Sequence, residues 1–260
     1  TGEGSTLSRD EHVEVMRHTI KAVNHRIPVI AGTGSNDTAF AVELSKEAEE
    51  MGADGLLLVS PYYNKASQKG HVTPYYNKCS QEGLIRHYEY IADRTELPII
   101  LYNVPSRTGT NIACETYKVL SAHKNIVAVK EANGDISSVA HTVSLCGDSL
   151  DIYSGNDDQV IPMISLGGKG VISVFSNFAP KTMSEITGLA LEGNFKEATA
   201  LQSKYLELMN SMFIDVNPIP VKEAMNLLGY NVGPCRLPLC STTPEKLEKI
   251  KAALKGVNLL

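Results

Sequence analysis

Short apolar runs and longer stretches of mixed apolar and polar residues alternate along most of the chain. The apolar runs, rich in Ile, Val and Leu, are Ile27–Ala31, Gly55–Val59, Ile99–Tyr102, Ile126–Lys130, Asp151–Ser154 and Gly170–Val174. A turn and a segment of helical length follow each of them: Asp37–Met51, Gln81–Thr95, Cys114–His123, Ser137–Cys146, Gln159–Leu166 and Lys181–Leu191. Continuous apolar strands separated by helices predict a parallel sheet with both faces covered.

Repeated strand–helix units leave two solutions, a closed barrel or an open doubly wound sheet. The length of 260 residues favours the barrel, because α/β barrels use about 250 residues in one domain. The chain shows about six of the eight strands that a TIM (β/α)₈ barrel needs. Its start, Thr1-Gly-Glu-Gly4, is typical of the middle of a loop. We therefore expect the first strands to precede residue 1.

The pattern changes after Leu191, where no further strand is indicated. Three helices are predicted instead, over Asn194–Phe213, Pro218–Leu228 and Thr243–Leu254, and Thr243 followed by Pro and Glu is a good start signal. We predict a barrel domain over residues 1–192, lacking its first strands, and a C-terminal helical region over residues 193–260.

A tandem repeat interrupts the connection between the second strand and its helix. Residues 59–71 and 72–84 are identical at nine of thirteen positions, and the repeat is too short for a solenoid. The simplest interpretation is an insertion without function. Strand pairing fixes the first copy, whereas a connecting loop tolerates insertion. We therefore expect Pro61-Tyr62-Tyr63 to keep its place and residues from about 66 to 78 to form an outward loop.

Composition and charge exclude several classes of protein. The chain is 43% hydrophobic and 20% charged, as in an ordinary globular domain. A net charge of −5 without a basic cluster argues against a nucleic-acid partner. No apolar run approaches the ~18 residues of a membrane span, and no signal peptide is visible. Five cysteines without a CxxC pair, and histidines without ligand spacing, predict a cytoplasmic protein with reduced thiols and no metal.

Candidate chemistry stands at the ends of the predicted strands, where parallel barrels place their active sites. Lys130 ends the otherwise apolar run Ile-Val-Ala-Val-Lys. Burial favours the neutral amine of a lysine, which can attack a carbonyl and form an imine. Tyr102 ends the neighbouring strand, so its hydroxyl could relay protons to that nitrogen. Arg107, two residues before Gly109, offers a fork that suits a carboxylate.

Each of these residues also has an interpretation without function. Lys130 could form a salt bridge with Glu131 at the rim, which from the strand alone is equally probable. A tyrosine at a strand end is more often a packing residue, and an arginine in a loop is usually a surface residue. The position of Lys130 at the catalytic face favours function.

Seven runs of sequence, spread over nearly the whole chain, resemble the dihydrodipicolinate synthase (4-hydroxy-tetrahydrodipicolinate synthase) family of class I pyruvate-dependent aldolases. They are Thr1-Gly-Glu, Pro28-Val-Ile-Ala-Gly-Thr-Gly34, Pro61-Tyr-Tyr-Asn, Tyr102-Asn-Val-Pro-Ser-Arg-Thr-Gly109, Val129-Lys-Glu-Ala132, Gly170-Val-Ile-Ser173 and Asn217-Pro-Ile-Pro-Val-Lys222. The resemblance implies that Lys130 takes pyruvate as an imine and that Tyr102 passes the protons. The enamine then adds to L-aspartate-4-semialdehyde, which Arg107 holds, in diaminopimelate and lysine synthesis.

The resemblance implies further site residues. Thr1 matches a threonine that binds the pyruvate carboxylate, the backbone of Ile172 lines the pyruvate site, and Gly155 lies close by. A relay tyrosine reaches across a tight dimer in the family. Tyr63 matches it, with Tyr76 of the second repeat copy as the alternative. The resemblance implies no cofactor and a homotetramer made of tight dimers.

The family's lysine-inhibitor site is only partly kept. His12, Asn36 and Tyr62 (or its counterpart in the second copy) match it, whereas Phe40 replaces a glutamate and Arg9 a histidine of lysine-sensitive members. Two alternatives to the synthase stay open. The chain could be another pyruvate-dependent lyase, such as N-acetylneuraminate lyase or a keto-sugar-acid aldolase, which would share Lys130 and Tyr102 without needing Arg107. It could also be a non-catalytic, truncated barrel.

Overall fold

The computed structural model describes residues 2–62 and 79–260. Its contacts divide the chain into two compact units. The strand unit comprises Ser8–Gly155 and Leu166–Gly168, and the helical unit comprises Thr1–Leu7, Asn156–Ser165 and Lys169–Leu260. Four predictions, for Thr1, Tyr63, Tyr76 and the loop of residues 66–78, fall outside the described residues.

The strand unit is built on five parallel strands in the order of the sequence. They are β1 (Ile30–Gly32), β2 (Gly55–Val59), β3 (Ile99–Asn103), β4 (Ile126–Glu131) and β5 (Asp151–Ser154). Leu56, Leu58, Ile99 and Leu101 are fully buried, as expected where helices cover a parallel sheet. The six predicted strands are confirmed, but the last, predicted over Gly170–Val174, spans only Gly170–Val171. The first begins later than predicted, because Ile27 is 65% exposed and lies outside the sheet.

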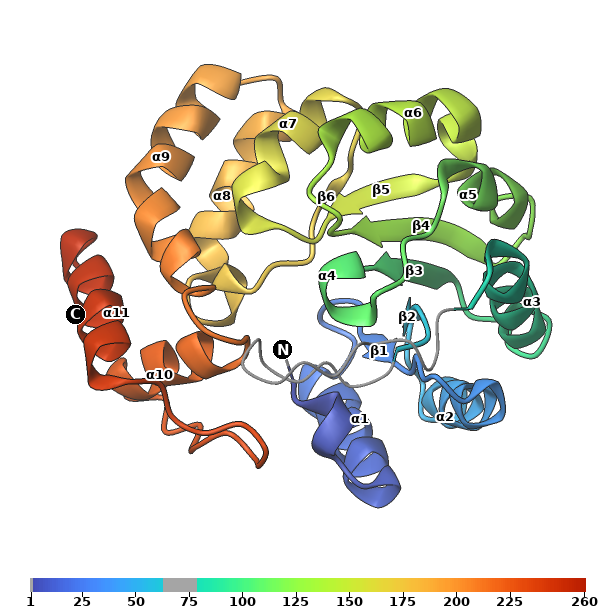
Figure 1. Ribbon diagram of the computed structural model, residues 1–260, viewed down its shortest axis with the longest axis horizontal. Helices are drawn as coiled ribbons and strands as arrows, with labels where there is room; N and C mark the ends of the chain where they lie inside the picture. Colours follow the sequence, from blue (N-terminus) through green and yellow to red (C-terminus); the bar gives the residue numbers. More distant parts are fainter. Residues whose placement is uncertain (1, 63–78) are drawn as a thin grey trace. The chain divides into compact units, whose positions relative to one another are not determined.

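Helices α2 (Thr38–Glu50), α3 (Gln81–Ala92), α5 (Cys114–Leu120) and α6 (Ile136–Cys146) follow the first four strands in turn and flank them along one side (Figure 1). Helix α1 (Arg9–Val23) precedes β1, and the short α4 (Pro105–Thr108) follows the carboxyl end of β3. Asp37 starts α2, because its side chain accepts the N–H groups of Ala39 and Phe40. Helix α1 is an addition to the predictions, and a capping box between Ser8 and Glu11 starts it.

The helical unit holds β6 (Gly170–Val171), α7 (Val160–Ser165), α8 (Pro180–Leu191), α9 (Phe195–Ser211), α10 (Ile219–Leu227) and α11 (Pro244–Gly256). The last three confirm the predicted C-terminal helices, and Thr243 caps α11 by accepting the Lys246 N–H. One apolar core, with Phe175, Ile186 and Leu254 among its members, joins these helices to α7 and α8. The division into residues 1–192 and 193–260 stays a prediction. With six strands in its described part, the chain has the α/β architecture of a (β/α)₈ barrel.

The two copies of the tandem repeat are anchored at opposite ends. The first copy leaves β2 at Val59, and the Ser60 N–H donates to the Tyr102 carbonyl at 3.1 Å. The second copy enters α3, where the Ser80 hydroxyl accepts the Gly83 N–H at 3.1 Å. Leu84 of the second copy is fully buried. The strand therefore fixes one copy and the helix fixes the other.

Candidate functional site

Lys130 and Tyr102 lie side by side at the ends of neighbouring strands. The two residues pair in register between β3 and β4. The Lys130 Nζ lies 4.1 Å from the centroid of the Tyr102 ring, within reach of a cation–π interaction. Both side chains are half-buried. The structure thus brings together the predicted Schiff-base lysine and the predicted proton-relay tyrosine.

Arg107 stands near this pair. It lies on α4, the short helix that begins two residues after β3 ends, and it is exposed to solvent. Gly109 ends this helix with a φ of 70°, which glycine adopts without strain. Burial raises the pKa of Tyr102, the charge of Arg107 lowers it, and the charge of Glu131 raises it. The Tyr102 hydroxyl therefore keeps its proton at neutral pH and can donate it.

Gly155 borders the strand that carries Lys130. Its N–H donates to the carbonyl of Glu131 at 2.7 Å. A Cβ at this position would lie 2.6 Å from the Cβ of Ala132, so only glycine fits this close approach. Tyr153 of β5 pairs in register with Lys130. It was not among the candidates predicted from the sequence. Burial and the charge of Asp151 raise the pKa of Tyr153.

A buried carboxylate follows Lys130 in the chain. Glu131 is 4% exposed, and its side chain accepts hydrogen bonds from the Tyr117 hydroxyl at 2.8 Å and from the Asn103 amide at 3.0 and 3.1 Å. These contacts hold the Glu131 carboxylate inside the strand unit, and not at the rim, where a salt bridge with Lys130 had been the alternative to a functional lysine. Tyr117 and Asn103 were not among the candidates, because no local pattern connects α5 to the end of β3.

The residues of the supposed effector site are spread over α1 and the turns after β1 and β2. The Nε2 of His12 lies 2.9 Å from the Gly32 carbonyl. Asn36 is exposed and accepts a hydrogen bond from the Ser35 hydroxyl at 3.4 Å. Tyr62 is half-buried, and burial raises its pKa. Their role in binding an effector stays a prediction.

In the helical unit, Ile172 directly follows β6 and is half-buried. The same unit contains an ion pair that links two of the motifs behind the resemblance. Lys222 Nζ donates to Glu3 Oε2 at 2.6 Å, and the side chains are 17% and 13% exposed. Burial raises the pKa of Glu3, but hydrogen bonds from Lys222 and the Arg236 N–H outweigh this and lower it. Glu3 also has a positive φ of 55°, which this pair holds in place.

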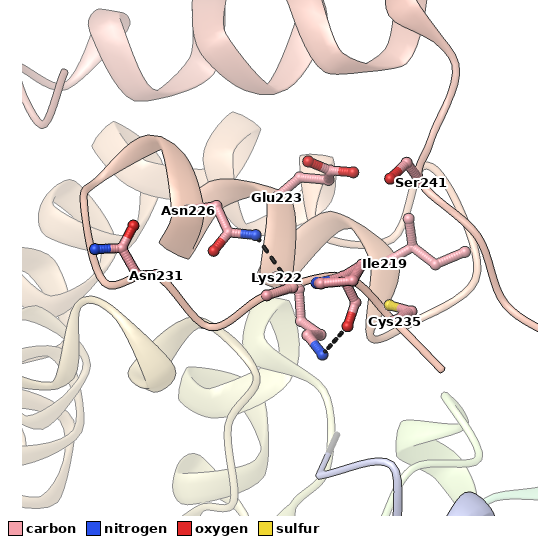
Figure 2. Close-up of a pocket in the computed structure, with 9 residues that line it drawn as sticks. Ile219, Lys222, Glu223, Asn226, Asn231, Cys235 and Ser241 are labelled. Carbon is pink, nitrogen blue, oxygen red and sulfur yellow. Dashed lines mark hydrogen bonds between the residues drawn. The ribbon is translucent and has the colours of Figure 1, made fainter. Parts of the chain in front are cut away.

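A cavity of about 330 Å³ lies beside α10 in the helical unit (Figure 2). Its lining residues are Ile219, Lys222, Glu223, Asn226, Asn231, Gly233, Pro234, Cys235 and Ser241. The Lys222 ammonium donates to the Pro234 carbonyl at 2.7 Å, and the Asn226 amide donates to the Gly233 carbonyl at 3.1 Å. Dashed lines that start at Lys222 and Asn226 mark these bonds in Figure 2. Because Lys222 is also bonded to Glu3, this cavity offers no lysine for imine chemistry.

Two searches of the described residues bear on other classes of function. Within residues 2–62 and 79–260, no group of three or more His, Cys, Asp or Glu side chains could hold a metal ion. In the same part of the chain, every helix is too short or too polar to cross a membrane.

Known proteins resemble the chain over its whole length. The sequence model of the dihydrodipicolinate synthetase family matches residues 1–72 and 70–257, two stretches that meet inside the tandem repeat. The 4-hydroxy-tetrahydrodipicolinate synthase of Caldicellulosiruptor saccharolyticus is 53% identical over 261 residues, with 100% of this chain and 84% of that protein covered. Synthase 1 of Clostridium acetobutylicum is 50% identical over 260 residues, with the same coverage. The crystal structure of the Acinetobacter baumannii dihydrodipicolinate synthase, complexed with pyruvate, matches with a TM-score of 0.91 and 41% identity, covering 100% of this chain and 84% of that one.

Proposed function

Because this chain belongs to the dihydrodipicolinate synthetase family, we propose that it condenses pyruvate with L-aspartate-4-semialdehyde, as a 4-hydroxy-tetrahydrodipicolinate synthase. The observation that carries the proposal is the contact of Lys130 with the Tyr102 ring at the ends of β3 and β4. Imine formation requires an amine and a group that can donate a proton, and the two strand ends bring together Lys130 and Tyr102, which carry these groups. The A. baumannii relative, whose crystal contains pyruvate, supports pyruvate as the first substrate.

Lys130 and Tyr102 divide the first half of the reaction between them. The neutral Lys130 amine attacks the keto carbon of pyruvate, and the carbonyl oxygen leaves as water after it is protonated. Tyr102 is suited to supply that proton, because burial raises its pKa and keeps the hydroxyl protonated. Loss of a proton from the methyl carbon of the imine then gives the enamine that acts as the nucleophile.

The second half of the reaction uses the semialdehyde. The enamine carbon adds to the aldehyde carbon, and the new alkoxide takes up a proton. The amino group of the semialdehyde then attacks the imine carbon, which closes the ring and releases Lys130. We assign the semialdehyde carboxylate to Arg107, whose guanidinium is exposed on α4 and close enough to Tyr102 to lower its pKa. Gly155 and Ile172 are proposed to line the site, with Thr1 as the binding residue for the pyruvate carboxylate.

Borohydride reduction in the presence of pyruvate tests this function. The chain should gain the mass of one reduced pyruvate adduct, and peptide mapping should place it on Lys130. Lys130→Ala should abolish the gain, while Lys118→Ala, a change at an exposed lysine of α5, should leave it intact. A label that persists in Lys130→Ala would refute the assignment. A labelled protein that does not consume the semialdehyde would instead favour another pyruvate-dependent lyase.

We also propose that the protein acts in the cytoplasm as a homotetramer made of tight dimers, the assembly that the family resemblance implies. Analytical ultracentrifugation at several protein concentrations measures this directly. A single species with the mass of one chain at all concentrations would contradict it.

A further inference from the structure

The residues that follow Tyr102 and Lys130 form a second register pair, with a different environment. Asn103 pairs with Glu131, and successive side chains of a strand point to opposite faces. Asn103 is fully buried and Glu131 is 4% exposed. The Asn103 amide lies 3.0 and 3.1 Å from the two carboxylate oxygens of Glu131. This polar bridge therefore ties β3 to β4 immediately beyond the reactive pair.

The other partners of Glu131 are also hydrogen-bond donors. The fully buried Tyr117 donates its hydroxyl at 2.8 Å, and the Asn133 N–H donates at 2.9 Å. Burial, together with the charge of Glu131, raises the pKa of Tyr117 well above its ordinary value, so its hydroxyl keeps its proton. A group that accepts from three separate donors is satisfied as a carboxylate. Burial raises the pKa of the Glu131 carboxyl, whereas the hydrogen bonds from Asn103, Tyr117 and the Asn133 N–H oppose this shift and favour the carboxylate, which they hold at a fixed position inside the strand unit.

Asn103 extends this network to the segment that carries Arg107. Its amide also donates to Asn111 Oδ1 at 2.8 Å, and its side-chain oxygen accepts the Ile112 N–H at 3.1 Å. Arg107 lies between these contacts in the chain, four residues after Asn103 and four before Asn111. Both ends of the segment that presents Arg107 are therefore held by a side chain that Glu131 holds in turn.

We propose that Glu131 is a positioning residue for the reaction, which fixes Tyr102, Lys130 and Arg107 relative to one another and holds a negative charge near Tyr102. The inference rests on the proposed function, since it assigns these three residues to the reaction. It predicts effects of two kinds. The first is electrostatic and changes the pKa of Tyr102. The second is geometric and changes the KM for the semialdehyde.

The electrostatic effect follows from what sets the acidity of Tyr102. Burial raises its pKa, the Arg107 charge lowers it, and the Glu131 charge raises it. Glu131→Gln keeps the shape of the side chain and removes the charge, so the pKa of Tyr102 should fall. Glu131→Asp keeps the negative charge, so the pKa of Tyr102 should stay close to its value in the unaltered protein. Tyr117→Phe removes a donor but leaves the carboxylate, and it should leave the titration of Tyr102 unchanged.

An NMR titration of the protein with isotope-labelled tyrosine measures the pKa of Tyr102, and the Tyr102→Phe variant identifies the Tyr102 signal.

Asn111→Ala tests the geometric effect, because it removes the side-chain oxygen that accepts the Asn103 amide, at an exposed residue. It should raise the KM for the semialdehyde several-fold without slowing pyruvate trapping. An unchanged Tyr102 titration in a folded Glu131→Gln protein, or an unchanged semialdehyde KM in Asn111→Ala, overturns the inference. If Glu131→Gln does not fold, Asn111→Ala decides alone. Failure of the unaltered protein to trap pyruvate would refute the proposed function instead.

Discussion

The ammonium nitrogen of Lys130 lies 4.1 Å from the centre of the Tyr102 ring. The two side chains reach this contact from neighbouring parallel strands in which their backbones pair directly. The ring therefore faces the lysine that we assign to imine formation, and the hydroxyl at its edge is available for proton transfer. The hydroxyl of Tyr102 can be removed while the ring is kept, which separates their two roles.

Tyr102→Phe should keep the contact with Lys130 and lose the proton relay. We expect kcat to fall about 100-fold or more, the lower range for loss of a general acid–base, while borohydride still traps pyruvate, more slowly. Tyr102→Leu should also disturb the position of Lys130, so borohydride should trap less pyruvate in this variant than in Tyr102→Phe. Tyr90→Phe is the matched control, because Tyr90 is exposed and its ring contacts Arg94 instead. Near-normal turnover in Tyr102→Phe would remove Tyr102 from the mechanism.

Arg107→Ala should separate the two substrates. A charge-assisted contact to a carboxylate contributes about 1.5–3 kcal/mol, so kcat/KM for the semialdehyde should fall about 10- to 100-fold. Pyruvate trapping should change little. Arg107→Lys should recover only part of the loss, because an ammonium lacks the fork geometry. Arg86→Ala on the exposed face of α3 controls for lost surface charge. If semialdehyde use stays normal, the case for the synthase over other pyruvate lyases weakens.

The sequence predicted the positions of the strands along the chain well, because buried parallel strands are continuous apolar runs. Lys130 was found because a charged residue ended such a run, and the register of β3 and β4 then brought Tyr102 beside it. Helix α1 was missed, although the capping box of Ser8 and Glu11 was a readable signal for its start.

Contacts between distant elements could not be predicted in this way. Glu131 looked like a rim partner for Lys130, but its carboxylate bonds with Asn103 and Tyr117, from β3 and α5. No sequence pattern singles out His87, which is 7% exposed. Such burial depends on which helix packs beside which strand, and local periodicity does not contain that information.

Lysine should inhibit this enzyme weakly or not at all. An amino-acid effector needs a partner for its ammonium, and Phe40, half-buried in the first turn of α2, has no charge. Arg9 would add like-charge repulsion if it pointed inward. Its guanidinium instead pairs with Glu47 of α2, so the prediction depends on Phe40. Steady-state assays check it, and sub-millimolar inhibition would contradict it. Phe40→Glu should strengthen any inhibition, whereas Ala39→Glu, which adds the same charge at an exposed neighbour, should not.

His87 should make the fold sensitive to acid. Its Nδ1 lies 2.8 Å from the Thr38 hydroxyl, and burial lowers its pKa from 6.5 to about 4. The unfolded chain therefore binds this proton more tightly, and stability falls as the pH drops from 6.5 through about 4. The full difference corresponds to about 3 kcal/mol.

Denaturant unfolding at a series of pH values from 7 to 4 measures this loss. His87→Gln should be less stable at neutral pH and lose less on acidification. His141→Gln, at an exposed histidine of α6, should follow the unaltered protein. An equal acid sensitivity in His87→Gln would show that other groups cause it.

The tandem repeat offers two tyrosines for one place in the family pattern, and only activity can separate them. The first copy continues β2 through Val59, Ser60 and the buried Pro61, whereas the second is fixed by the start of α3. A residue close in sequence to a fixed strand end has less freedom than one in a tolerated insertion. We therefore expect Tyr63→Phe to reduce kcat much more than Tyr76→Phe. The reverse order would mean that the helix-anchored copy supplies the relay. Deletion of residues 66–78, which removes Tyr76 and leaves a single copy, should keep turnover near normal if the first copy supplies the relay. Small and equal losses in both variants would mean that neither tyrosine takes part in proton transfer.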